Sequence, residues 1–239
     1  MVDDDPVLVR MKNLLNDWEP VNDRRLIFLQ CYAAMTQNIL AAIEARDFED
    51  VSWVATLMKN FADLYFYALE AEDSGLASAP IAWRIAFKAA HNPQTNVLQN
   101  LVLGVNAHIN YDLVLALSDL LASEWQQLSE EQRQIRYHDH CHVNDIINHT
   151  IDTVQDQVVD RFEPEFRLVD KVLGPVDEWM TGLLISEWRE EVWKHAIQMI
   201  DSTEQTGRQE IIKHVEQVSI ERAQDILGKG NLTDLLNLV

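Results

Sequence analysis

The sequence has few turn-forming residues and few positive charges. It contains 7 glycines and 6 prolines in 239 residues, so its glycine share is about half the usual ~7 %. Such a chain favours long helices joined by short connections. Its 19 Lys and Arg against 39 Asp and Glu give a net charge of −20. Because so acidic a surface repels phosphate backbones, we expect no nucleic-acid partner.

Cysteines and long apolar runs are also scarce. The two cysteines, Cys31 and Cys141, lie far apart without a CxxC spacing, which excludes a cysteine-only zinc site and a disulfide framework. The amino terminus, MVDDDPVLVR, is acidic where a signal peptide is basic, and no apolar segment follows it. We find no uninterrupted apolar run of about 18 residues. We therefore expect no membrane span and a cytoplasmic protein with reduced thiols.

Helical periodicity runs along nearly the whole chain, without strand-like alternation, a repeat or a domain linker. Asp5-Pro6 reads as an N-cap followed by a proline at the first helical position, and Ser129 with Gln132 as a capping box. The expected helices cover about 5–18, 23–45, 49–72, 95–124 and 129–161, with a short one from Pro80, three beyond Pro164 and a short terminal one. The pattern predicts an all-α, single-domain multi-helix bundle over residues 1–239, with the helix of about 95–124 buried at its centre.

The most unexpected residues of that central helix are His108 and Asp112. They stand four apart on one face of a helix that is otherwise rich in Val and Leu. Since an unpaired buried charge is costly, each needs a partner. Three interpretations stay open: a structural hydrogen bond, two ligands of a divalent metal such as zinc, or a general base held by a carboxylate.

Asn106 and Asn110 form a second polar pair, on the opposite side of the same helix. We expect them to hydrogen-bond to neighbouring helices and so to set the packing register. Contact with a ligand is the alternative interpretation.

A histidine-rich tract, YHDHCHVNDIINHT at 137–150, resembles a metal site at first sight. Helical phase places three of its histidines on the solvent side, namely His138, His142 and His149. His140 and Asn144 point to the core stripe, where they could face His108 and Asp112. A further histidine, His195, flanks the apolar face of a late helix and is a third candidate for contact with a ligand.

Two classes of function fit these residues. In the first, a divalent-metal-dependent hydrolase, His108 and Asp112 supply two ligands and His140 or His195 the third. A metal-bound water, its pKa lowered to ~7, then attacks the substrate. In the second, a non-catalytic helical binding or assembly protein, His108 and Asp112 are a buried structural pair. Either class allows a small-molecule ligand and a homo-oligomer.

Four segments together carry a family resemblance: FADLYFYAL (61–69), AWR (82–84), NAHINYDLVLAL (106–117) and VND (143–145). With a late Trp-rich helix they resemble an uncharacterised bacterial family, a domain of unknown function centred on an NAHINxDL motif. The resemblance implies a single helical domain, with the motif residues at Asn106, His108, Asn110 and Asp112.

The segment HINYD is also similar to the HxxxD zinc-ligand pairs of the zinc-dependent phospholipase C and single-strand nuclease group. That likeness implies zinc held by His108 and Asp112. The sequence contains no second HxxxD pair.

Overall fold

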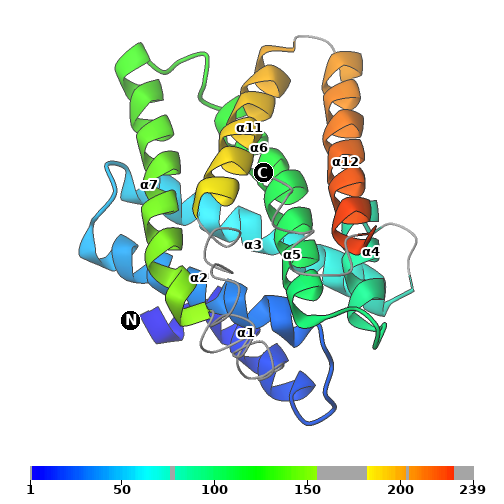
Figure 1. The fold of residues 1–239 in the computed structure, drawn as a ribbon. Helices are drawn as coiled ribbons and strands as arrows, with labels where there is room; N and C mark the ends of the chain where they lie inside the picture. Colours follow the sequence, from blue (N-terminus) through cyan, green and yellow to red (C-terminus); the bar gives the residue numbers. More distant parts are fainter. Residues whose placement is uncertain (1, 76–78, 155–181, 203–204, 229–239) are drawn as a thin grey trace.

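The computed structural model describes residues 2–75, 79–154, 182–202 and 205–228 (Figure 1). Within these ranges every regular element is a helix, which confirms the all-α prediction. The elements are η1 (Val2–Asp4), α1 (Pro6–Trp18), α2 (Leu26–Ala45), α3 (Val51–Asp73), α4 (Ile81–Ala90), α5 (Val97–Ala107), η2 (His108–Asp112), α6 (Leu113–Ala122), α7 (Glu130–Val154), α11 (Gly182–Asp201) and α12 (Gln205–Gly228).

The predicted helix starts are made by the expected side chains. The Asp5 carboxylate accepts from the Val7 N–H at 2.9 Å, with Pro6 at the first helical position. At α7, Gln132 Oε1 accepts from the Ser129 N–H at 2.9 Å, and Ser129 Oγ accepts from the Gln132 N–H at 3.2 Å. Both caps are therefore confirmed. The end of the helix expected over 129–161, the first part of the region beyond Pro164 and the short terminal helix lie outside the described residues.

The central helix consists of α5, η2 and α6, which continue into one another through the middle of the fold (Figure 1). α5 packs on α2, α4 and α12, and α6 packs mainly on α11. The central helix runs from Val97 to Ala122, close to the expected 95–124, but it is not a uniform α-helix. The turn from His108 to Asp112 is a π-helix, in which the Leu113 N–H donates to the carbonyl of His108. Such π turns occur frequently at functional sites.

The apolar side chains of the long helices are buried in the core. One cluster of buried side chains extends from Val7 in α1 to Ile226 in α12. Among the described residues, two helical segments are long and apolar enough to cross a membrane, by length and composition alone: Leu26–Ala45, with mean hydropathy 1.5, and Val97–Ala122, with 1.3. Of the second, 83 % is buried within the protein, as expected for a core helix.

α2 and the central helix approach closely at Gly104. A Cβ atom at this position would overlap the ring of Phe28. The Phe28 ring in turn lies edge-on to the imidazole of His108, with centroids 5.8 Å apart. The glycine therefore lets α2 come near enough for its aromatic side chains to surround His108.

Candidate functional site

His108 and Asp112 form a buried hydrogen-bonded pair. They are 3 % and 1 % exposed, and His108 Nδ1 lies 2.9 Å from Asp112 Oδ2. The same Oδ2 accepts a hydrogen bond from Trp83 Nε1 of α4 at 2.8 Å. The expected burial and contact of the pair are confirmed. The tryptophan was not predicted as a partner, because it lies 29 residues away in the chain.

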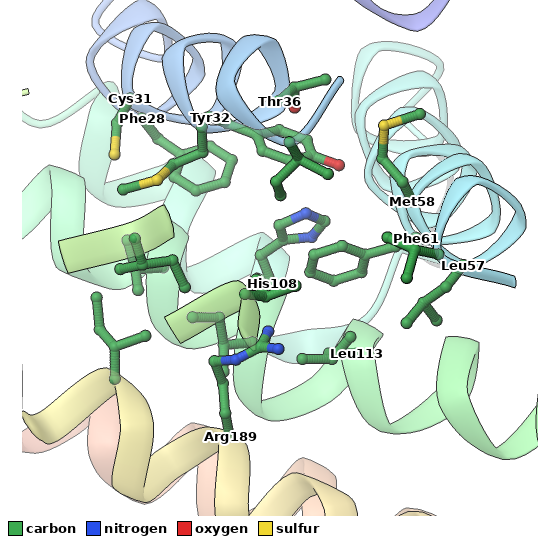
Figure 2. A pocket seen from close by; sticks show the side chains of 18 residues that line it. Phe28, Cys31, Tyr32, Thr36, Leu57, Met58, Phe61, His108, Leu113 and Arg189 are labelled. Carbon is green, nitrogen blue, oxygen red and sulfur yellow. The ribbon is translucent and has the colours of Figure 1, made fainter. Parts of the chain in front are cut away.

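Aromatic rings enclose the imidazole of His108. Phe61 of α3 stacks on it, with centroids 3.6 Å apart and planes 7° from parallel, and Tyr32 of α2 lies edge-on at 4.3 Å. Figure 2 shows the imidazole between Phe61 and the α2 side chains. This packing and the bond to Asp112 hold the ring in one orientation.

Burial dominates the protonation of the pair. It lowers the pKa of His108 well below the usual histidine range. It raises the pKa of Asp112 well above the usual range, against the opposing effect of the hydrogen bond from Trp83. His108 is therefore neutral near pH 7. Its Nδ1 is engaged with Asp112, whereas its Nε2 is buried and has no hydrogen-bond partner.

A cavity of about 120 Å³ adjoins this imidazole, between α2, α3, α7, α11 and the central helix. Its walls are mainly apolar, with Leu57 and Met58 among them (Figure 2). Tyr32 and Thr36 also line it, and their hydroxyl oxygens are buried without a partner. Among the described residues, six buried side-chain atoms lack a hydrogen bond, and three of the six belong to residues that line this one cavity.

Arg189 of α11 is the one arginine among the described residues that line the cavity, and it is 4 % exposed. Its Nη2 donates to the carbonyl of His140 at 2.6 Å, and its Nε donates to Asn144 Oδ1 at 2.6 Å. Burial lowers the pKa of Arg189 to about 10, so the guanidinium is still a cation at neutral pH. No Asp or Glu in the described ranges forms an ion pair with it.

His140 and Asn144 thus face inward as expected, but they contact Arg189 and not His108. The sequence reasoning missed Arg189. Its acidic neighbours in SEWREE suggest an exposed face, yet helical spacing places it with Ile185 and Val192 on the buried stripe of α11. That periodicity was the available signal.

The structure does not bring His195 to the pair either. It is half-buried beside His214 of α12, with ring centroids 5.5 Å apart. Across the described ranges, no group of three or more His, Cys, Asp or Glu side chains is placed to hold a metal ion. The third ligand that the metal hypothesis requires at His108 and Asp112 is therefore not supplied by His140 or His195.

The two asparagines on the other side of the central helix are fully engaged. Asn106 Nδ2 donates to the carbonyl of Ser219 in α12 at 2.8 Å, and Asn110 Nδ2 donates to Asn106 Oδ1 at 3.0 Å. Arg222 Nη1 of α12 donates to Asn110 Oδ1 at 2.7 Å. The expected bonds between helices are confirmed, and these amides face α12, away from the cavity.

The solvent side of the histidine-rich tract follows the predicted phase. His138 and His149 are exposed. His142 is half-buried against the ring of Phe48, and its two ring nitrogens lie 3.1 and 3.2 Å from the carboxylates of Asp47 and Asp145. These three histidines form local surface contacts outside the cavity lining.

Comparison with known proteins gives a family but no activity. Searches of curated proteins and of solved structures find no significant match to this chain. Residues 5–229 match a family profile, which covers the described helices from α1 to α12. The chain therefore belongs to the Family of unknown function (DUF5995).

Proposed function

We propose that this protein binds a small, mainly apolar molecule with a hydrogen-bonding group, held in the cavity beside His108. The observation that supports it is the gathering of three unpartnered buried polar atoms, on His108, Tyr32 and Thr36, around one apolar cavity. We further propose that NAHINYDL, residues 106–113, is the functional centre of the family.

The energetic argument is that unpaired polar atoms are expensive to bury. Each such atom costs on the order of 1–3 kcal/mol. Three of them at one cavity are therefore not expected if these residues serve only the packing of the core. A ligand that supplies the missing donors or acceptors recovers this cost. The volume of about 120 Å³ limits its size. A cavity of about 150 Å³ holds benzene, so the part of the ligand that this cavity encloses has roughly six non-hydrogen atoms.

A titration with 1-hexanol, followed by NMR, tests this proposal. We expect saturable shifts at the methyl groups of Leu57 and Met58 and at the ring of Tyr32. Val143→Phe fills the cavity from its half-buried α7 side and should abolish these shifts. The matched control is Val9→Phe, an exposed position on α1. Saturable binding that is the same in both variants, or absent from the natural protein, would contradict the proposal.

A second candidate function is acid–base catalysis by His108 on a bound ligand. The observation that favours it is the arrangement of the ring, which lines the cavity, with Nδ1 bonded to Asp112 and Nε2 without a hydrogen-bond partner. General bases in enzymes use this arrangement. The thiol of Cys31 also lines the cavity, but burial raises its pKa to about 12, so it is a poor nucleophile. Proton transfer to or from the ligand is thus the chemistry this lining offers.

Long-range ¹H–¹⁵N NMR of the histidine rings tests this candidate. A general base needs the proton of His108 on Nδ1, with Nε2 free to accept. We expect Asp112→Ala to weaken the preference for the proton on Nδ1, because it removes Oδ2, the acceptor for that proton. A proton on Nε2 in the natural protein would rule out the base role.

The likeness to the zinc-dependent phospholipase C and single-strand nuclease group stays a separate prediction. It requires a stoichiometric metal bound through His108 and Asp112. Elemental analysis of the purified protein and of His108→Ala tests it. We expect chelation to leave the melting temperature unchanged, because the described residues contain no three-ligand group. One equivalent of zinc that is lost in His108→Ala would instead support the metal-dependent hydrolase.

A further inference from the structure

Arg189 differs from Arg25 and Arg136, two partly buried arginines that each pair with carboxylates. Arg25 pairs with Asp23 and Asp73, and Arg136 pairs with Asp50 and Glu124. Arg189 is more deeply buried than either, at 4 % exposure, and within the described part of the chain no carboxylate pairs with it. A buried cation without a counter-ion costs several kcal/mol even after relaxation. A bound anion would offset this cost.

The groups that hold Arg189 are neutral. His140 Nε2 lies 3.0 Å from the carbonyl of Arg189, and Nδ1 lies 3.3 Å from Nη2. This pattern fits a ring that donates through Nε2 and accepts at Nδ1, as a neutral histidine does. Burial and the nearby guanidinium both lower the pKa of His140, which agrees with this state. His140 and Asn144 thus orient the guanidinium without neutralising it.

The guanidinium also has capacity left for a ligand. Nε and Nη2 are bonded to Asn144 and His140, while Nη1 has no hydrogen-bond partner among the described residues. Figure 2 shows the side chain rising from α11 toward His108, with Thr36 on the far, α2 side of the imidazole. The part of the lining that the structure describes contains no lysine and no second arginine. It therefore offers one positive charge at one end of an apolar cavity.

We propose that the ligand of this cavity is a small monocarboxylate, whose carboxylate binds Arg189 and whose apolar body lies against Leu57, Met58 and Ile147. This inference rests on the proposed function. An arginine matches a carboxylate in charge and geometry, and charge-assisted hydrogen bonds are about twice as strong as neutral ones. A dianion would leave one charge uncompensated within apolar walls. The acidic surface opposes an approaching anion, so added salt should speed association.

Calorimetric titrations with three six-carbon probes at pH 7 test the proposal: hexanoate, 1-hexanol and hexylammonium. They share one apolar body and differ in the charge of the head group. A hydrogen bond to a charged group adds about 1.5–3 kcal/mol, so we expect hexanoate to bind about 10- to 100-fold more tightly than 1-hexanol. Hexylammonium should not bind. Arg189→Gln should remove the preference for hexanoate, and the matched control Arg208→Gln, at an exposed pair with Asp119, should retain it.

The outcomes separate the two proposals. If 1-hexanol binds as tightly as hexanoate, the monocarboxylate inference is overturned while ligand binding in the cavity stands. If none of the probes binds, the proposed function fails as well. Should Arg189→Gln not fold, nuclear Overhauser contacts in the natural protein decide. Contacts from the C2 protons of hexanoate to the Arg189 side chain support the inference, and contacts from its terminal methyl group to Arg189 overturn it.

Discussion

The two polar pairs of the central helix have the same spacing and opposite surroundings. Asn106 and Asn110 face α12, where Ser219 and Arg222 satisfy their amides. On the other face, Asp112 is bonded to Trp83 and His108, but His108 Nε2 has no hydrogen-bond partner, and His108 lines a cavity. The first pair has the completed bonds of a packing contact. In the second pair the His108 ring is also held in place, but its Nε2 has no hydrogen-bond partner, which agrees with the proposed ligand site.

The arginines beside the two pairs repeat this difference. Arg222 donates to Asn110 and pairs with Glu191, so its charge is compensated within the protein. Arg189 is held only by neutral groups. Buried polar groups in natural proteins are nearly always satisfied, so unsatisfied ones at a single cavity are informative. The comparison therefore supports a packing role for one face and the proposed ligand site on the other.

Asn106→Ala should have the largest effect on stability, and none on binding. It leaves Asn110 Nδ2 and the carbonyl of Ser219 unpaired and opens a small void, which together cost about 2–4 kcal/mol. Urea unfolding measures the loss, and the affinity for 1-hexanol should stay unchanged. A weaker affinity would show that the two faces are coupled and would remove the contrast between them.

Gly104→Ala should destabilise the protein by about 1–3 kcal/mol, because the added methyl group overlaps Phe28 and pushes α2 from the central helix. The matched control is Gly228→Ala, where a Cβ atom meets nothing. Thermal unfolding of the two variants gives the difference. Equal melting temperatures would show that close packing at Gly104 does not hold the aromatic cage around His108.

His140 should make the stability depend on pH. Burial and Arg189 lower its pKa in the folded protein, while in the unfolded chain it takes up a proton below about pH 6.5. The unfolded state therefore binds more protons as the pH falls, and this histidine's contribution to stability is lost by up to roughly 1.4 kcal/mol per pH unit. Unfolding at pH 7, 6 and 5 should show a shallower loss in His140→Gln.

His142 provides the opposite sign as a control. Burial lowers its pKa, but hydrogen bonds to Asp47 and Asp145 outweigh burial, and the net direction is upward. Its contribution is present below about pH 6.5 and is lost as the pH rises through the folded pKa. His142→Gln should therefore make the loss of stability on acidification steeper. If His140→Gln also makes the loss steeper, the assignment of His140 as a neutral support of Arg189 is wrong.

Thr36→Val should have the smallest effect on stability and a clear effect on binding. It removes an unpartnered buried hydroxyl while keeping the shape, so stability should be unchanged or rise by up to about 1 kcal/mol. The affinity for 1-hexanol should fall. Thr56→Val on the exposed side of α3 is the control, since the Thr56 hydroxyl bonds only to the carbonyl of Ser52 in its own helix. A stability loss above about 1 kcal/mol would show that the Thr36 hydroxyl is satisfied in solution.

Predictions from the sequence succeeded where the interacting residues are neighbours in the chain. The Asp5 and Ser129 caps and the contact between His108 and Asp112 all join residues within four positions. The π turn at His108 was not predicted, because apolar spacing does not distinguish it from an α turn. Nor was Trp83 as the second partner of Asp112, since α4 reaches the central helix only when the fold is assembled.

The sequence by itself determined that the chain is helical and that the central helix carries two polar pairs on opposite faces. These properties follow from side-chain periodicity and from caps, which act over about one helical turn. Only the tertiary structure decided which pair is satisfied. It placed α12 over the asparagines, and around His108 it set a cavity together with the cation of Arg189. A buried hydrogen bond or ion pair joins atoms of helices that are far apart in the chain, and the residue pattern within one helix does not predict which helices come into contact.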